Sequence, residues 1–138
     1  MSRLAMCLGR RYVPKPPMKL FVLLAILTDC RRDTLDSPDA LRAALDAAVA
    51  AGPFTGLGTL VVPFSPQGVT ACAVVGESHI ALHTWPEEGR LFVDVASCST
   101  KESVERALDA IRAVFPEGKL AVLDERVLDG GVISSVAR

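Results

Sequence analysis

The sequence has little charge imbalance and few aromatic side chains. Its 15 Lys and Arg residues nearly balance 16 Asp and Glu residues, the formal net charge is −1, and aromatic residues make up 5% of the 138 positions. A basic surface for a nucleic-acid backbone or an anionic membrane is therefore not expected. A base-stacking surface of the RNA-binding kind is not expected either, since aromatics are scarce. The composition predicts neither a nucleic-acid nor a membrane partner.

Cysteine is sparse, and no Cys-x-x-Cys pair is present. The four cysteines are Cys7, Cys30, Cys72 and Cys98. Secreted disulfide scaffolds are usually shorter and richer in cysteine. A structural zinc site normally uses closely spaced Cys pairs, so it has weak support here. We expect reduced thiols in a cytoplasmic protein, and no bound metal.

Long hydrophobic runs are also lacking. The apolar stretch from Leu20 to Leu27 is far below the roughly 20 residues that a membrane-spanning helix needs. Basic residues precede it, as they precede the hydrophobic part of a signal peptide, but no small-residue cleavage site follows. We therefore expect a strand buried on both faces. The preceding residues, 1–18, contain "VPKPP" and are expected to be irregular because proline interrupts helices.

Hydrophobic periodicity and turn residues predict six strands and two helices. The strands are expected at 19–28, 58–64, 68–75, 79–85, 90–98 and 120–128. Ser37-Pro38 is a helix start with an N-cap serine, and Gly52-Pro53 is its end. The sequence Ser99-Thr-Lys-Glu102 is typical of a capping box that starts the second helix, which ends at Pro116. Their apolar stripes are Leu41, Ala44, Leu45, Ala48 and Val49 in the first, and Val104, Ala107, Leu108, Ile111 and Phe115 in the second.

The order of these elements predicts the fold class. Four consecutive strands are joined by short turns, which implies antiparallel neighbours. Two amphipathic helices must then cover one face of the sheet. We predict a single α+β domain over residues 1–138, a two-layer sandwich with a mainly antiparallel sheet and two helices on one face. The second face carries Val and Leu with no helix to cover it, which favours a homodimer.

The rare polar and aromatic residues gather in "GESHIALHTWPEEG", residues 76–89. Both histidines of the chain, His79 and His83, and its only tryptophan, Trp85, are here. Taken singly, each has a structural interpretation, and Trp85 would ordinarily be core. Taken together, two kinds of site are open. One is a zinc site that uses His79, His83, Cys72 and Cys98. The other is a Ser, His and Cys site that acts on a carbonyl, with Ser78 as nucleophile.

The motif "ESHIALHTWPE", with "FSPQGVT" upstream and Cys98 downstream, resembles the short S-adenosylmethionine decarboxylases of bacteria and archaea. The resemblance extends over residues 19–128. It implies a proenzyme in which Ser78 attacks the carbonyl of Glu77. An ester forms and eliminates, and the chain divides into a β chain, residues 1–77, and an α chain, residues 78–138. Residue 78 then carries a pyruvoyl group as the cofactor.

The resemblance also implies roles in catalysis and processing. The substrate amine would form a Schiff base with the pyruvoyl carbonyl, which withdraws electrons as CO₂ leaves. Cys98 would return the proton to Cα. His83 would assist chain cleavage, and Thr70 would hold the oxyoxazolidine intermediate of the acyl shift. The family more often has Ser at the position of Thr70, and Thr keeps the hydroxyl.

Substrate-binding residues follow from the same resemblance. Phe64 and Trp85 would contact adenine, and Glu87 would accept hydrogen bonds from both ribose hydroxyls. His79 has no role by this comparison and is expected to be structural. The implied activity is decarboxylation of S-adenosylmethionine, which gives the aminopropyl donor for spermidine synthesis, in a homodimer of αβ units.

Two alternatives stay open. The same pyruvoyl chemistry could act on ornithine or arginine, because aromatic and acidic residues also suit a cationic side chain. Alternatively, the chain could be an unprocessed paralogue that regulates a partner enzyme. The joint presence of Glu77, Ser78, His83 and Cys98 argues against that second possibility.

Overall fold

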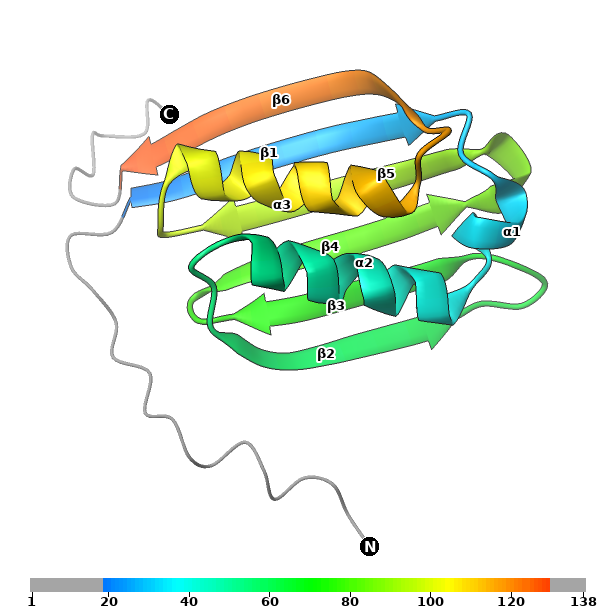
Figure 1. Cartoon of the computed structure of the whole chain (residues 1–138), viewed down its shortest axis with the longest axis horizontal. Coiled ribbons are helices and arrows are strands. Elements are labelled where there is room, and N and C mark those ends of the chain that lie inside the picture. Colours follow the sequence, from blue (N-terminus) through cyan, green and yellow to red (C-terminus); the bar gives the residue numbers. More distant parts are fainter. Residues whose placement is uncertain (1–18, 130–138) are drawn as a thin grey trace, which may run out of the picture.

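The computed structural model describes residues 19–129, which form a sheet covered on one face by two helices (Figure 1). The six strands, in the spatial order β2-β3-β4-β5-β1-β6, pair antiparallel throughout. The strands are β1 (Lys19–Thr28), β2 (Gly56–Pro63), β3 (Val69–Val75), β4 (Ser78–Trp85), β5 (Arg90–Ser97) and β6 (Lys119–Asp129). The helices are α1 (Arg32–Leu35), α2 (Pro38–Ala51), the 3₁₀ turn η2 (Pro86–Glu88) and α3 (Lys101–Val114). The predicted α+β two-layer sandwich is confirmed.

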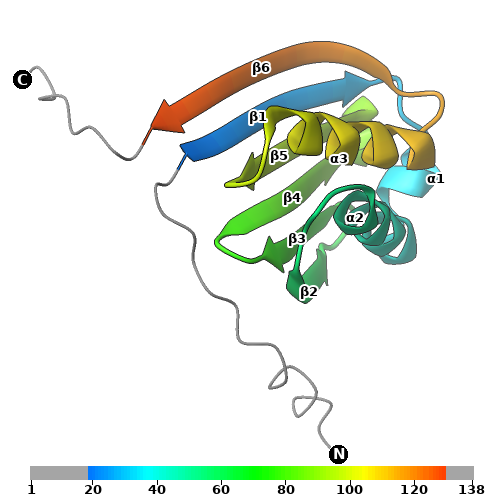
Figure 2. The ribbon, with the colours of Figure 1, turned by 60° about the vertical axis from the view of Figure 1, so that its left-hand side comes forward.

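The two long helices lie side by side on the same face of the sheet (Figure 2). The apolar stripe of each helix faces the sheet, and most of its members are buried, as the periodicity predicts. The helix stripes pack on alternate residues of the strands. The largest fully buried side chains of this interface and its surroundings are Phe115, Leu23, Leu27, Leu35, Leu41, Leu45, Ile80, Leu82, Leu91, Ile111, Val69 and Val93. One continuous core therefore joins both helices to the sheet.

Both long helices start at a capping hydroxyl, but the predicted start of α3 needs one correction. Ser37 caps α2, since its side chain accepts a hydrogen bond from the Ala40 amide at 3.2 Å. The capping box predicted from Ser99 to Glu102 is wrong by one residue. Thr100 is the N-cap of α3, and its Oγ1 accepts from the Ser103 amide at 3.2 Å. The hydroxyl of Ser99 is engaged elsewhere, 3.1 Å from Ser97 Oγ.

The other face of the sheet has no layer over it among the described residues. Leu60 is 67% exposed there, and Val62 and Val74 are exposed as well. On β1 only alternate residues are fully buried, so the expectation of a strand buried on both faces is wrong. The reason is that no layer of described residues covers this second face of the sheet, which leaves Val22 and Leu24 half-buried. We call this side of the sheet the open face.

Two short elements are not predicted from hydrophobic periodicity, because each is about one turn long and a single turn shows no repeat. They are α1, just after β1, and η2, in the turn between β4 and β5. Both lie at the same end of the sheet (Figure 1).

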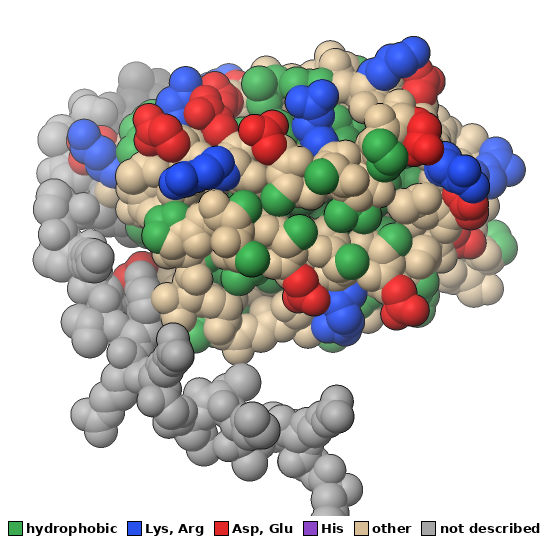
Figure 3. All heavy atoms as spheres, viewed as in Figure 1, with side chains coloured by type: hydrophobic (Ala, Val, Ile, Leu, Met, Phe, Trp, Pro, Cys, Tyr) green, Lys and Arg blue, Asp and Glu red, His purple; other side chains and the backbone are tan. Residues whose placement is uncertain are grey.

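Charged side chains of both signs are intermingled on the helix-covered face (Figure 3). Between residues 19 and 129, the structure has no helix with the length and apolar character needed to cross a membrane. The predicted irregular segment 1–18 lies outside the described residues.

Candidate active site

Ser78 is the first residue of β4 and follows the turn at Gly76 and Glu77. Gly76 has φ of 64°, a left-handed conformation that glycine adopts without strain. The tight turn brings Ser78 opposite Val75 of β3, on the side of the sheet that carries the helices. Ser78 is only 8% exposed. Its hydroxyl is thus largely shielded from water while Glu77, beside it, is exposed.

Cys98 lies next to Ser78, although the two are far apart in the sequence. Strand β5 runs antiparallel to β4, with Ala96 opposite His79, so the end of β5 returns to the start of β4. The backbone amide of Cys98 donates a hydrogen bond to Ser78 Oγ at 3.1 Å. The Ser99 amide donates to Ser97 Oγ at 3.1 Å, which fixes the loop on either side of Cys98. Two of the predicted catalytic residues are therefore neighbours.

Thr70 and His83 form a second pair. They are direct cross-strand partners on β3 and β4. Thr70 Oγ1 is 2.9 Å from His83 Nδ1, so one donates to the other according to the tautomer of the ring. The ring of His83 also packs against Phe92, with centroids 5.9 Å apart. The sequence had linked His83 with Thr70 only through the family resemblance.

Within one chain, the structure does not bring these two pairs together. Ser78 and His83 are five residues apart on the same strand, which corresponds to about 17 Å along β4. An odd separation also places their side chains on opposite faces of the sheet. His83 lies on the open face, and Ser78 lies on the helix side.

The three predicted substrate-binding residues lie at the same end of the sheet as His83. Phe64 directly follows β2, Trp85 ends β4, and Glu87 is in η2. Phe64 is 54% exposed and Trp85 44%, so the ordinary interpretation of Trp85 as a core residue is wrong. Glu87 is exposed too, and its Oε2 accepts a hydrogen bond from Gln67 Nε2 at 3.2 Å. Two exposed aromatic rings and a carboxylate thus occupy one end of the sheet.

His79 faces the open side and lies 3.2 Å from Asp94, measured from Nε2 to Oδ1. This contact gives the His79 ring a carboxylate partner on the neighbouring strand, and its structural role stays a prediction. Cys72 faces the same side, and the pKa of its thiol is raised, first by burial and then by the charge of Asp94. In the part of the chain that the structure describes, no three His, Cys, Asp or Glu side chains form a group able to hold a metal ion. The three cysteines in that part, Cys30, Cys72 and Cys98, are free thiols.

Sequence reasoning missed the residues that hold the turns of this site. Arg32 Nε donates to the carbonyl of Pro86 at 3.3 Å, and Arg32 Nη2 donates to the carbonyl of Glu87 at 3.4 Å. Asp36 Oδ1 accepts from the Gly68 amide at 2.8 Å. These contacts join residues more than thirty positions apart. No local pattern in the sequence could have indicated them.

Comparison with known proteins identifies a family model and sequence relatives that match most of this chain. The family model described as S-adenosylmethionine decarboxylase matches residues 22–124. The S-adenosylmethionine decarboxylase proenzyme of Methanococcus aeolicus is 36% identical over 102 residues, which cover 74% of this chain and 87% of the relative. The proenzyme of the same name from a Hydrogenobaculum species is 33% identical over 112 residues, which cover 80% of this chain and 81% of the relative.

A solved structure agrees with these sequence relatives. The crystal structure of the adenosylmethionine decarboxylase from Aquifex aeolicus superposes with a TM-score of 0.69 and 27% sequence identity. The match covers 88% of this chain and 97% of that one, so the whole architecture is shared. On the family model, on these relatives and on this fold, the chain belongs to the S-adenosylmethionine decarboxylase family.

Proposed function

We propose that this protein is a self-processing, pyruvoyl-dependent decarboxylase of S-adenosylmethionine. The observation that carries the proposal is the placement of Ser78. Its shielded hydroxyl begins a strand, follows directly on the Glu77 carbonyl, and lies beside the backbone of Cys98. A serine hydroxyl fixed next to the carbonyl of the preceding residue is the arrangement that an N-to-O acyl shift requires.

In the proposed processing, Ser78 Oγ attacks the carbonyl carbon of Glu77. The C–N bond breaks, and an ester links Glu77 to the Ser78 side chain. Loss of the Cα proton of residue 78 then expels the Glu77 carboxylate and leaves a dehydroalanine. Water replaces the nitrogen of that residue, which leaves as ammonia, and residue 78 becomes a pyruvoyl group. The products are the β chain, residues 1–77, and the α chain, residues 78–138.

The surroundings of residue 78 fit such a group. Once formed, the group supplies an electron-withdrawing carbonyl that stabilises the negative charge left at the substrate Cα when CO₂ departs. Cys98 is the proposed proton donor to that carbon. The backbone amide of Cys98 lies 3.1 Å from Ser78 Oγ, so residue 98 is within reach of a group formed at residue 78. The Ser97 and Ser99 hydroxyls, 3.1 Å apart, help to hold the loop that carries it.

The substrate proposal depends on the far end of the sheet. Phe64 and Trp85 present exposed ring surface, and Glu87 presents a carboxylate. An adenosine has a flat base for aromatic contact and two vicinal hydroxyls that a carboxylate can accept from. Ornithine and arginine have neither group. The names of the relatives also favour S-adenosylmethionine over these amino acids.

The proposed assembly is a homodimer that buries the open face. Exposed Leu60, Val62 and Val74 lie on that face, and apolar patches of this kind are typical of protein interfaces. In a two-fold contact each chain offers the same surface to the other. One end of the sheet carries Ser78, and the other carries His83 and the substrate-binding residues. In the proposed dimer the His83 end of the partner lies against the Ser78 end of this chain and reaches the helix-side hydroxyl around the start of β4, supplying the groups that its own chain holds about 17 Å away.

An unprocessed regulatory role has less support. Such a protein would need neither the Ser78–Cys98 contact nor the Thr70–His83 hydrogen bond. Both are intact in this structure. A regulatory paralogue would gain no stability from an exposed Trp85 and Phe64.

The test is the intact mass of the purified protein under denaturing conditions, followed by an assay of CO₂ release. We expect two fragments divided between Glu77 and Ser78, with the C-terminal fragment showing the mass of a pyruvoyl group. We also expect CO₂ from S-adenosylmethionine, but not from ornithine or arginine. An uncut chain that releases no CO₂ would favour the regulatory role, and a cut chain active on ornithine would change the substrate.

A further inference from the structure

The connector between β1 and α2, residues 29–37, holds two turns that are far apart in the sequence. We propose that its short helix α1 sets the spacing between Phe64 and Glu87, with Arg32 and Asp36 as positioning residues for the nucleoside part of the substrate. The inference rests on the proposed function, because it takes Phe64 and Glu87 as substrate-binding residues. It adds a structural cause for their relative placement.

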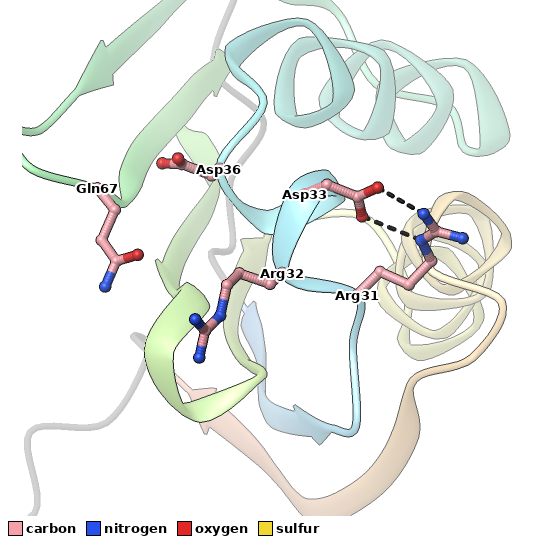
Figure 4. A pocket seen from close by; sticks show the side chains of 5 residues that line it. All are labelled: Arg31, Arg32, Asp33, Asp36 and Gln67. Atoms are coloured by element: carbon pink, nitrogen blue, oxygen red, sulfur yellow. Dashed lines mark hydrogen bonds and ion pairs between the residues drawn. The ribbon is translucent and has the colours of Figure 1, made fainter.

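Arg32 acts on the Glu87 side. Its guanidinium donates to two successive carbonyls, those of Pro86 and Glu87, at 3.3 and 3.4 Å. A planar guanidinium has several donors in a fixed geometry, so one side chain can bridge two acceptors. These bonds fix the backbone of η2, from which the Glu87 side chain projects. Figure 4 shows the Arg32 side chain extended toward this turn.

Asp36 acts on the Phe64 side. Its Oδ1 accepts from the Gly68 amide at 2.8 Å. Gly68 in turn accepts from the Phe64 amide at 2.8 Å and closes the turn between β2 and β3. Gly68 has φ of 102°, where a side chain would be strained, so this turn has a defined shape. Asp36 thereby ties the connector to the loop that begins at Phe64.

The connector is itself fixed to the body of the protein. Leu35 of α1 is fully buried in the core. The Cys30 amide donates to the Gly89 carbonyl at 3.0 Å, just after η2. A Cβ on Gly89, whose φ is 64°, would lie 3.3 Å from the Cys30 carbonyl oxygen, so the two segments are in close contact. A rigidly held α1 can therefore define the positions of both turns.

An open hollow of about 480 Å³ lies between the connector and the turn that joins β2 to β3. It is lined by Arg31, Arg32, Asp33, Asp36 and Gln67 (Figure 4). Gln67 also reaches Glu87, with its Nε2 donating to Oε2 at 3.2 Å. The Glu87 backbone is thus held from one side of the hollow by Arg32, and its carboxylate from the other by Gln67. This double attachment is what a carboxylate needs in order to meet two ribose hydroxyls in one orientation.

Arg31 is a matched control for Arg32. The two arginines are adjacent, but their guanidinium groups point apart (Figure 4). Arg31 Nε donates to Asp33 Oδ1 at 3.0 Å. This hydrogen bond is the main reason why the pKa of Asp33 is lowered to about 2. Arg31 is therefore engaged within the connector, and it makes no hydrogen bond to η2 in the described part of the chain.

The experiment compares Arg32→Ala with Arg31→Ala in the full chain. We expect Arg32→Ala to raise KM for S-adenosylmethionine by about 3- to 10-fold, the range for loss of one or two modest hydrogen bonds. We expect kcat and the extent of self-cleavage to stay near the wild-type values, because Arg32 donates its hydrogen bonds to the η2 backbone and not to Ser78, His83 or Cys98. Arg31→Ala should leave KM unchanged. Arg32→Lys keeps the charge but not the planar fork, so its KM should be intermediate.

A second pair tests the Phe64 side. Asp36→Asn retains an oxygen that accepts from the Gly68 amide, whereas Asp36→Ala does not. We expect KM to rise in Asp36→Ala and to stay near wild type in Asp36→Asn, with similar melting temperatures for both. In a chain that already carries Glu87→Gln, the further change Arg32→Ala should raise KM little. Both changes act through the contact between the Glu87 side chain and the ribose hydroxyls.

The outcomes separate the inference from the function on which it rests. A wild-type protein that cleaves itself but does not turn over S-adenosylmethionine would overturn the proposed substrate, and the inference with it. An active wild type in which Arg32→Ala and Asp36→Ala keep the normal KM would overturn the inference alone. Arg32→Ala could instead lower kcat, raise KM and reduce cleavage together, with a lowered melting temperature. That result would show a general folding role and would also contradict the inference.

Discussion

The hydroxyl of Thr70 lies 2.9 Å from Nδ1 of His83, on neighbouring strands of the open face. Both residues are remote from Ser78 of the same chain, whose hydroxyl is 3.1 Å from the amide of Cys98. The residues predicted to cooperate in one site therefore form two separate pairs. This division shapes the predictions that follow.

Replacement of Ser78 tests the cleavage chemistry directly. In Ser78→Ala no hydroxyl remains to attack the Glu77 carbonyl, so we expect a single uncut chain. Its fold should be retained, because among residues 19–129 the side chain accepts a single hydrogen bond, from the Cys98 amide. Denaturing mass spectrometry measures the result. Two fragments divided between Glu77 and Ser78 in this variant would contradict the proposed nucleophile.

Replacement of Cys98 should separate processing from turnover. We expect Cys98→Ala to cleave at the normal site, because the hydrogen bond to Ser78 comes from the backbone amide of residue 98. Its kcat for decarboxylation should fall by about 10²- to 10⁴-fold, the usual contribution of a positioned proton donor. Cys72→Ala, at a thiol on the open face, is the control. Wild-type turnover in Cys98→Ala would assign the protonation step to another residue.

The Thr70–His83 pair should control the rate of cleavage. We expect His83→Ala to slow the appearance of the two fragments by about 10²-fold or more, as for other acid–base residues. Thr70→Val should slow it less, by about 5- to 10-fold, because it removes one hydrogen bond. Thr70→Ser keeps the hydroxyl and should cleave normally. The time course of fragment formation after synthesis measures all three, and equal rates in Val and Ser variants would exclude a role for the hydroxyl.

Co-expression tests whether the site is shared between two copies. If His83 of one chain serves Ser78 of its partner, then Ser78→Ala chains should speed the cleavage of His83→Ala chains in mixed dimers. The doubly substituted chain, which offers neither residue, should give no such rescue. Mass spectrometry distinguishes the chains by mass. Absence of rescue in a confirmed mixed dimer would mean that each site is built within one chain.

Cys30 predicts a pH dependence of stability. Burial, together with the charges of Asp29 and Glu117, raises the pKa of its thiol from 9.0 to about 11. The folded protein thus holds this proton more tightly than the unfolded chain does, so this contribution to stability is complete below pH 9 and is lost as the pH rises toward 11. We expect the free energy of unfolding to fall over that interval, and to fall less in Cys30→Ala. Urea unfolding at several pH values measures this free energy. The same pH dependence in the wild type and in Cys30→Ala would contradict the prediction.

The fold was predictable because its signals are local and repeated. The alternation of apolar residues along β3 and β4 and the short turns between strands indicated an antiparallel sheet. The stripes of α2 and α3 indicated helices that share one face. The helix start at Thr100 was misplaced by one residue, because Ser99 and Thr100 have similar capping chemistry and only the packed loop selects between them.

The candidate site was predictable in part. The run from Glu77 to Glu87 is distinctive enough in sequence to indicate the family, and the comparisons confirm that membership. The roles of Ser78, His83 and Cys98 remain predictions that the experiments above address. The division of these residues between the two ends of the sheet was not predictable from the motif, because it depends on strand direction, register and face.

The chemistry that this chain can offer is already present in its linear order of residues: a serine after a glutamate, a distant cysteine, and aromatic and acidic residues at the end of a strand. The helices and strands are encoded there too, because hydrophobic periodicity is a property of nearby residues. Which of these groups come into contact depends on the way the strands and helices pack. Pairing of β4 with β5 places Cys98 against Ser78, and α1 places Arg32 against η2. Such contacts depend on the packing of segments distant in sequence, and no local pattern encodes them.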